Sequence, residues 1–330
     1  MSILCTSFTL HSNNKMHYLA RTMDFGFELD GRPVVIPRNY VWALQLGGEY
    51  KTKFGFVGTG KNVGNYIVAD GMNEKGLAMA ELYFLNEAIY NEQQDPNLLN
   101  LAPHEFIMWV LGELSSIQEL KERINEVNIV NVETELLSTV IPLHFIVTDR
   151  TGETVVIENN TGKLDIKNNP VGVMTNSPDL GWHLKNLNNY LSLQPTNFSN
   201  KEIDGYEIKP MGQGSGTVGL PGGYSSPERF VRTVYNRSHT ISGVSKEENI
   251  NAIFHILDGV TIPKGVVVKD DGAIDYTQYR AILDVSELKY YFNPYENQSV
   301  YSVTLDEQLL NLNEPKEFNF STNFDIKELN

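Results

Sequence analysis

The chain has 330 residues, of which 41% are apolar, and this supplies enough apolar surface for a sizeable folded core. Its formal net charge of −15 at pH 7 opposes binding to nucleic acids and to anionic lipid surfaces. A single cysteine, Cys5, excludes an intrachain disulfide and a cysteine-based metal site. No apolar run approaches the ~20 residues of a membrane span, so we expect a cytoplasmic protein that binds neither membranes nor nucleic acid.

Strands dominate the predicted structure of the first 85 residues. Segments 5–10 and 17–21 flank Ser12-Asn13-Asn14-Lys15, a run of turn-forming residues, and predict a hairpin with Cys5 at its open end. A second hairpin is indicated by segments 66–70 and 77–84, with residues 71–76 as its turn.

Helices and a strand meander are predicted for the middle of the chain. Pro103 suits the first turn of a helix that extends to Leu114, and Ser116 to Glu119 matches the capping box that begins a second helix. Segments 143–148, 153–158 and 163–166 then alternate with glycine-containing turns and predict three consecutive strands.

The last third of the chain repeats this mixture of helices and strands. Ser226-Pro227 and a capping box from Ser245 to Glu248 predict two helices, and short strands are expected at 276–283, 289–293 and 300–303. Neither a flexible linker nor an internal repeat divides the chain. We therefore predict one α+β domain in which helices pack on antiparallel sheets.

Two patterns that suggest cofactors are set aside. Residues 214–219 match the dinucleotide-binding glycine pattern, but Leu220-Pro221-Gly222-Gly223 follows where that fold requires a helix. The seven histidines include no pair at metal-ligand spacing. We expect neither a nucleotide cofactor nor a metal ion.

Cys5 is the candidate nucleophile. A lone cysteine is more often a small core residue, but the hairpin would bring Arg21 and Asp24 back beside it. A nearby cation lowers a thiol pKa, and a carboxylate can hold an amine in place. If Cys5 were the first residue, its own α-amine, with a reference pKa of about 7.7–8.0, would be a base next to the thiol. The alternative for Arg21 and Asp24 is an ordinary surface ion pair.

Short motifs in order along nearly the whole chain resemble the choloylglycine hydrolase family, which contains bile salt hydrolases and penicillin V acylases. Each motif alone is weak, but the ordered set is specific. The matching strings are Cys5-Thr6-Ser7, Ala20-Arg21-Thr22-Met23-Asp24-Phe25, Pro37-Arg38-Asn39-Tyr40, Asp70-Gly71-Met72-Asn73-Glu74-Lys75-Gly76-Leu77, Val173-Met174-Thr175-Asn176-Ser177-Pro178, Gly219-Leu220-Pro221-Gly222, Arg229-Phe230-Val231-Arg232 and Ile262-Pro263-Lys264-Gly265.

The resemblance implies an N-terminal-nucleophile hydrolase with an αββα sandwich, acting without metal or organic cofactor on small-molecule amides with an apolar acyl group. It also implies a homotetramer. By position, Cys5 would be the nucleophile, flanked by Arg21 and Asp24, and Arg229 would order the site. Asn176 would help to form the oxyanion hole, which suits an amide donor, and Tyr83 falls at the remaining oxyanion position. By spacing alone, Asn176 would instead be a turn residue before Ser177-Pro178.

The sequence departs from the family pattern at two places. Met1-Ser2-Ile3-Leu4 precede the nucleophile, so we expect residues 1–4 to be a short propeptide and residues 5–330 to be the single mature domain. Removal of Met1 alone would not expose Cys5. Gly223 stands where the family commonly has aspartate after Leu-Pro-Gly, so a different local hydrogen-bond pattern is expected there.

Tyr83 favours a penicillin V acylase-like substrate, because bile salt hydrolases usually have asparagine at this position and the acylases tyrosine. The phenol ring offers an apolar face to an aryl acyl group, although it could equally serve to pack the strand end. Hydrolysis of bile salts and amide hydrolysis of N-acyl homoserine lactones remain alternatives within the family. A non-catalytic ligand-binding protein, in which Cys5 stays internal, is an alternative of a different class.

Overall fold

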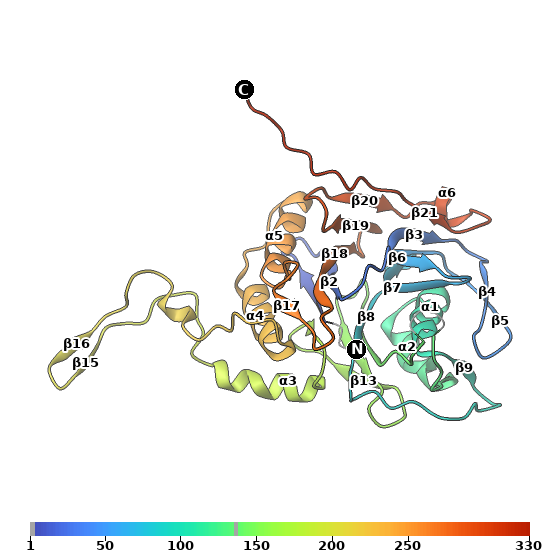
Figure 1. The fold of residues 1–330 in the computed structure, drawn as a ribbon, viewed down its shortest axis with the longest axis horizontal. Coiled ribbons are helices and arrows are strands. Elements are labelled where there is room, and N and C mark those ends of the chain that lie inside the picture. The colour runs from blue at the N-terminus through green and yellow to red at the C-terminus, as the bar shows by residue number, and fades with distance from the viewer. Residues whose placement is uncertain (1–3, 135–137) are drawn as a thin grey trace.

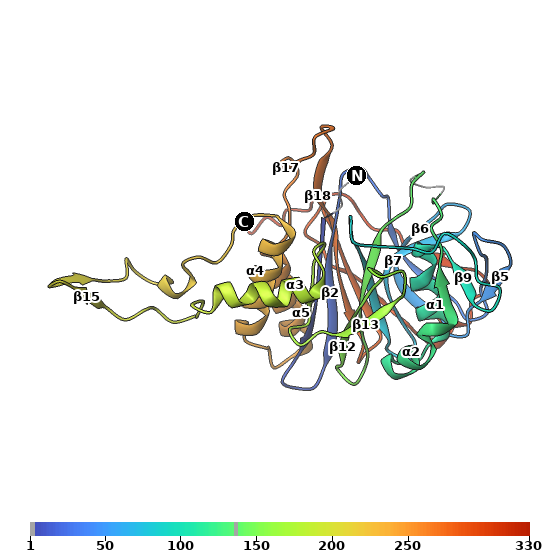
Figure 2. The same cartoon turned by 90° about the horizontal axis from the view of Figure 1, so that it is seen from below.

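The computed structural model describes residues 4–134 and 138–330, which form a four-layered αββα sandwich (Figures 1 and 2). Two large antiparallel sheets face each other at the centre, and helices cover both outer faces (Figure 2). The predicted α+β class and the αββα arrangement are confirmed. Of the expected propeptide, residues 1–3 lie outside the described residues, whereas Leu4 begins the first strand.

The first sheet contains both strands of the N-terminal hairpin at its centre. Its strand order is β14-β1-β2-β18-β19-β20, with β17 paired to the end of β18. The strands are β1 (Leu4–His11), β2 (His17–Phe25), β14 (Val173–Met174), β17 (Val267–Val268), β18 (Ile274–Asp284), β19 (Lys289–Pro294) and β20 (Tyr301–Thr304).

The second sheet is built mainly from the first half of the chain. Its order is β13-β12-β11-β8-β7-β6-β3-β21. The strands are β3 (Arg32–Ile36), β6 (Phe56–Asn62), β7 (Tyr66–Asn73), β8 (Ala78–Tyr83), β11 (Leu143–Thr148), β12 (Thr154–Glu158), β13 (Asp165–Asn168) and β21 (Lys316–Glu317).

Helices cover the outer face of each sheet. On the first sheet lie α3 (Leu180–Asn186), α4 (Ser226–His239) and α5 (Lys246–Asp258); on the second lie α1 (Phe106–Glu113) and α2 (Ile117–Arg123), as Figure 2 shows. A short helix, α6 (Glu307–Leu310), contacts β3. Single 3₁₀ turns are Pro103–Glu105, Ile124–Glu126, Leu187–Tyr190 and Ser215–Thr217.

Smaller strand pairs lie outside the two sheets. They are β4 (Val41–Ala43) with β5 (Glu49–Lys51), β9 (Leu99–Leu101) with β10 (Val127–Ile129), and β15 (Lys201–Ile203) with β16 (Tyr206–Ile208). The hairpin β15–β16 is the tip of an arm that projects far from the body beyond α3 (Figures 1 and 2).

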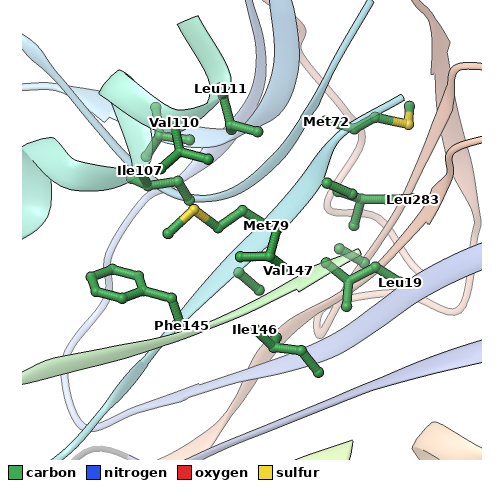
Figure 3. Packing of buried hydrophobic residues seen from close by; sticks show 14 of the residues in the cluster. Leu19, Met72, Met79, Ile107, Val110, Leu111, Phe145, Ile146, Val147 and Leu283 are labelled. Atoms are coloured by element: carbon green, nitrogen blue, oxygen red, sulfur yellow. The ribbon is translucent and has the colours of Figure 1, made fainter. Parts of the chain in front are cut away.

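Apolar side chains fill the space between the sheets and below α1 (Figure 3). Leu19 and Leu283 of the first sheet approach Ile146 of the second, and all three are fully buried. Burial of this kind contributes about 25 cal/mol per Å² of apolar surface and stabilises the layered arrangement. The core thereby holds the two sheets in a fixed relation.

The predicted hairpins and helices are confirmed with local corrections. Strands β1 and β2 pair as expected, but the second hairpin has a shorter turn than predicted because β7 continues through Gly71 to Asn73. Glycine is required at position 71 of this strand because a Cβ there would lie 2.8 Å from the Leu111 side chain of α1. The helix predicted from Pro103 begins with a 3₁₀ turn rather than an α-helical one.

One of the two predicted capping boxes forms completely. At α5, Ser245 and Glu248 exchange both hydrogen bonds. At α2, the Ser116 side chain accepts from the Glu119 N–H at 3.2 Å, but the Glu119 carboxylate accepts from the N–H of Ser115 instead.

Candidate active site

The hairpin β1–β2 places the thiol of Cys5 against the guanidinium of Arg21. Cys5 pairs with Met23 and Ser7 with Arg21, so alternate residues of both strands share the side that faces the second sheet. Nη2 of Arg21 donates to Sγ of Cys5 at 3.1 Å, and Sδ of Met23 lies 3.9 Å from the same sulfur. Cys5 is only 1% exposed, so this contact is screened from solvent.

Arg21 is held where β7 and β8 separate. Pairing between these strands ends at Asp70 and Ala80. Beyond that point, Nη1 of Arg21 donates to the carbonyl oxygens of Ala69 at 2.9 Å and Glu81 at 3.4 Å, one from each strand. The guanidinium therefore satisfies backbone acceptors that the missing strand pairing leaves open.

Asp70 is the acidic partner of Arg21, and the sequence did not single it out as a site residue. Its Oδ2 lies 3.4 Å from Nη1 of Arg21, and both side chains are fully buried. The hydroxyls of Tyr279 and Tyr290 each donate to the Asp70 carboxylate at 2.6 Å. These bonds fix the carboxylate and, through it, the guanidinium next to the thiol.

The main-chain nitrogen of Cys5 is bound by Asn176. Its N–H donates to Oδ1 of Asn176 at 2.8 Å, and Nη2 of Arg229 donates to the same oxygen at 2.7 Å. Nη1 of Arg229 donates to the carbonyl oxygen of Cys5 and, at 2.6 Å, to Oγ1 of Thr6. Arg229, on α4, thus joins β1, which carries Cys5, to the loop that carries Asn176.

The backbone N–H and C=O of Tyr83 face the amide of Asn176. The N–H of Phe84 donates to Pro142, and that of Leu143 donates to the Tyr90 hydroxyl, so Tyr83 and Leu143 form a non-hydrogen-bonded pair of the ladder. Both the N–H and the C=O of Tyr83 therefore point away from β11. Nδ2 of Asn176 donates to this C=O at 2.9 Å, which places the amide of Asn176 beside the N–H of Tyr83.

Asp24 lies near Cys5 but on the opposite side of the sheet. It pairs with Leu4, so its side chain points toward α4 with those of Thr6 and Thr22. Its carboxylate accepts from the hydroxyl of Thr22 at 2.9 Å and from that of Thr277 at 2.5 Å. Burial raises the pKa of Asp24 to about 6, although the positive charge of Arg229 opposes this shift.

The six residues expected at the site are brought together, but not as one cluster of side chains. Arg21 contacts the thiol, whereas Asn176 and Arg229 contact the main chain of Cys5. Burial raises the pKa of the Cys5 thiol, with Arg21 acting in the opposite direction. In this uncleaved chain the Cys5 nitrogen is a peptide nitrogen and cannot accept a proton, so no base adjoins the thiol on its own residue.

A mostly apolar pocket opens at the thiol. It encloses about 90 Å³, less than the 300–1,000 Å³ typical of ligand sites. Its lining includes Cys5, Phe25, Tyr83, Leu143 and a single carboxyl, that of Glu81. Among the described residues, no group of three or more His, Cys, Asp or Glu side chains is placed to hold a metal ion.

The unusual Gly223 is explained by a neighbouring carboxylate. A Cβ at position 223 would lie 2.3 Å from Oε2 of Glu228. That carboxylate accepts from the Ser225 hydroxyl at 2.5 Å, and Nη1 of Arg232 donates to the carbonyl oxygen of Gly223 at 2.8 Å. A side chain at position 223 would therefore clash with the Glu228 carboxylate.

Comparison with known proteins gives a consistent result over nearly the full chain. Residues 5–318 match the family described as linear amide C–N hydrolases, choloylglycine hydrolase family. The bile salt hydrolase/transferase of Clostridium perfringens is 32% identical over 99% of this chain and 100% of its own. The penicillin V acylase of Pectobacterium atrosepticum is 25% identical over 92% of this chain and 82% of its own.

Two solved structures also match nearly the full chain. Two variants of the conjugated bile acid hydrolase from Clostridium perfringens, one with a cysteine and one with an arginine replaced, superpose with a TM-score of 0.91 at 30% identity, covering 99% of this chain and 100% of theirs. No helix among the described residues is long and apolar enough to cross a membrane.

Proposed function

The chain belongs to the choloylglycine hydrolase family of linear amide C–N hydrolases, and we propose that it hydrolyses conjugated bile acids. The observation that carries this proposal is the whole-chain similarity to a bile salt hydrolase, which exceeds the similarity to a penicillin V acylase. The comparisons thus favour the alternative substrate over the acylase-like one that Tyr83 suggested. Family membership also argues against a non-catalytic binding protein.

The apolar pocket at Cys5 supports this substrate class. Phe25, Tyr83 and Leu143 offer an apolar surface to an acyl group whose carbonyl carbon lies at the thiol. A steroid acid is larger than the 90 Å³ enclosed here. Part of the steroid therefore stays outside, or the lining side chains move apart when it binds.

In the proposed reaction, Cys5 acts after residues 1–4 have been removed. The new α-amine takes the thiol proton, and Sγ attacks the amide carbonyl carbon. The α-ammonium then gives its proton to the leaving amine, and the acyl group remains on Cys5 as a thioester. Water, deprotonated by the same amine, attacks the thioester and releases the acid and the free thiol.

The surrounding residues stabilise the charges that form in these steps. Nδ2 of Asn176 and the N–H of Tyr83 lie together and would donate to the tetrahedral oxyanion. Arg21 favours the thiolate, because its guanidinium lies 3.1 Å from Sγ. In the solved variants of the Clostridium perfringens enzyme, the replaced cysteine and arginine stand 16 positions apart, as Cys5 and Arg21 do.

Arg229, on α4, contacts the main chain of Cys5, and the side chain of Asp24 lies on the same side of the sheet as Arg229. The Asp24 carboxylate would stabilise the α-ammonium electrostatically from the helix side of the sheet. Arg229 holds Asn176 and the carbonyl oxygen of Cys5 in position.

Penicillin V is the second candidate substrate, because the ring of Tyr83 lines the pocket and presents an apolar face. The two substrates are separated by comparing kcat/KM for glycine release from glycocholate with kcat/KM for phenoxyacetate release from penicillin V. We expect the mature protein to prefer glycocholate, and Cys5→Ala to cleave neither. A preference for penicillin V would replace the proposal with the acylase function.

We further propose a homo-oligomer assembled through the β15–β16 arm. The arm stands clear of the body in both views (Figures 1 and 2). It carries large apolar side chains that are exposed. Ile203 is 57% exposed, Tyr206 73% and Met211 fully exposed. Apolar groups gathered on a projecting segment are typical of a contact with another protein surface, and a second copy of this chain supplies one.

A further inference from the structure

Glu81 is a buried carboxyl that the proposed mechanism does not use. It lies on β8 two residues before Tyr83, so the two side chains share one side of the strand, and both line the pocket. Glu81 is 8% exposed, and among the described residues its Oε2 has no hydrogen-bond partner. An unpaired buried oxygen of this kind costs about 1–3 kcal/mol, so its presence calls for an explanation.

The partners of Arg21 leave the Glu81 side chain free for a ligand. Arg21 donates to the carbonyl oxygen of Glu81, and none of its hydrogen bonds reaches the Glu81 carboxyl. Its other bonds go to Cys5, Thr22, Met23, Ala69 and Asp70. Burial holds the pKa of Glu81 well above its ordinary value, with Arg21 opposing and Asp70 reinforcing the shift. Burial therefore favours the neutral carboxylic acid, which has one O–H donor and free acceptor positions.

We infer that Glu81 is a specificity-determining residue that forms hydrogen bonds with a hydroxyl group on the acyl part of the substrate. A hydroxyl can accept from the O–H of Glu81 and donate to its carbonyl oxygen, so one substituent satisfies both. An acyl group without a hydroxyl leaves the carboxyl unpaired. The inference rests on the proposed function, since it names a polar feature of that substrate class.

A cationic substituent fits this position less well. The guanidinium of Arg21 reaches the backbone of Glu81 itself, at 3.4 Å, and would repel an ammonium group there. If Glu81 recognised its ligand through a negative charge, Glu81→Gln would abolish that recognition. If it acts as a neutral hydrogen-bonding group, Glu81→Gln keeps the recognition, because an amide also donates and accepts hydrogen bonds.

The test compares pairs of substrates that differ by one hydroxyl. The pairs are the glycine conjugates of cholic and deoxycholic acid, and the glycine conjugates of phenylacetic acid and its three ring-hydroxylated isomers. We expect the wild type to prefer the hydroxylated member by about tenfold in kcat/KM for at least one pair. Glu81→Gln should retain most of this preference. Glu81→Met, which is of similar size and apolar, should reduce the ratio to about one.

Two controls separate specificity from stability. Glu105 is a carboxyl of comparable burial whose oxygens accept from the N–H groups of Gln45 and Ala102, both at 2.8 Å. Glu105→Gln should leave the substrate ratio unchanged. Glu81→Met should melt at or above the wild-type temperature, because it removes an unpaired buried polar group.

The outcomes distinguish this inference from the proposed function. The role of Glu81 would be overturned if the ratio of kcat/KM between hydroxylated and non-hydroxylated substrates were the same in the wild type and Glu81→Met. It would also be overturned if Glu81→Gln and Glu81→Met lost the hydroxyl preference to the same extent. Cleavage of the phenylacetyl conjugates without cleavage of the bile acid conjugates would instead overturn the proposed function, and the aryl pairs would still test Glu81.

Discussion

The peptide N–H of Cys5 donates a 2.8 Å hydrogen bond to Oδ1 of Asn176. Arg229 donates to the same oxygen, so the carbonyl end of the Asn176 amide is fixed from two directions. The amide nitrogen must then point toward Tyr83, where it donates to the backbone carbonyl and retains a second N–H. In the proposed mechanism, these two contacts to Oδ1 of Asn176 position both the nitrogen of Cys5 and an N–H donor for the oxyanion.

Asn176→Asp should lower kcat by about 10²–10³-fold while KM changes much less, because it keeps the acceptor for Cys5 and Arg229 but removes the donor. Steady-state kinetics would be measured in a chain expressed without residues 2–4, so that processing is not needed. Asn169→Asp is the matched control. Nδ2 of Asn169 also donates to a backbone carbonyl, that of Val173, at 2.9 Å, but Asn169 does not line the pocket. Unchanged kcat in Asn176→Asp would remove it from the oxyanion hole.

Asp24 should make the fold less stable as pH rises from about 4 to about 6. Its pKa is raised from 3.8 to about 6 in the folded chain, so the folded state binds more protons in this interval than the unfolded state does. The stabilising contribution is present below the unfolded pKa and is lost as pH rises through the folded one. A shift of about two units corresponds to on the order of 3 kcal/mol.

Urea unfolding of Cys5→Ala and of Cys5→Ala/Asp24→Asn at pH 4, 5, 6 and 7 tests this effect. The difference in the free energy of unfolding between the two proteins should change across the interval, with the aspartate-containing protein losing stability relative to the asparagine variant. A difference that stays constant with pH would show that Asp24 is already ionised at pH 4.

The projecting arm should determine the size of the assembly. Replacing Ile203 and Tyr206 by glutamate puts charges on the tip of the arm, where both side chains are largely exposed and β15–β16 lies far from β2 (Figure 1). We expect light scattering to give a smaller mass for this double variant than for the wild type, with an unchanged circular dichroism spectrum. Lys201→Glu/Lys209→Glu alters charge on the same arm without removing apolar surface, and should leave the mass unchanged.

Local sequence was sufficient to predict the N-terminal hairpin and to place Arg21 beside Cys5. Turn-forming residues define this hairpin, and the alternation of its strands carries the guanidinium to the thiol. The same alternation sends Asp24 to the other side, a distinction that requires the register. Asn176 and Arg229 lie 171 and 224 positions from Cys5, and only the family resemblance connected them.

Glu81 and Asp70 could not be assigned from sequence, because their environment depends on where β7 and β8 separate. At that point the backbone of β7 accepts a hydrogen bond from the Arg21 guanidinium, which comes from the other sheet. The helix α3 was also missed. This helix has only seven residues, and Gly181 and Trp182 near its start weaken the helical pattern. The side chain of Asp179 does cap its N-terminus.

Processing should control activity, because the proposed base is the α-amine of Cys5 and this nitrogen is a peptide nitrogen while Leu4 is attached. The uncleaved chain already has Arg21 at 3.1 Å from Sγ and Asn176 at 2.8 Å from the nitrogen, so what it lacks is the base rather than the geometry. Burial also keeps the pKa of the thiol raised in this form. General-base assistance is typically worth about 10²–10⁴-fold, and this is the loss expected for a blocked precursor.

Leu4→Pro is the direct probe of this control, because proline before Cys5 should hinder cleavage and residue 4 is absent from the mature enzyme. A chain expressed without residues 2–4 is the matched control, since removal of its initiator methionine exposes Cys5 without further processing. N-terminal sequencing establishes which form is present, and kcat is then measured for both with the same substrate. The blocked chain should begin at Met1 and turn over about 10²–10⁴-fold more slowly than the control. If it begins at Met1 and matches the control, the α-amine is not the base, and a side chain near Cys5 must accept the thiol proton.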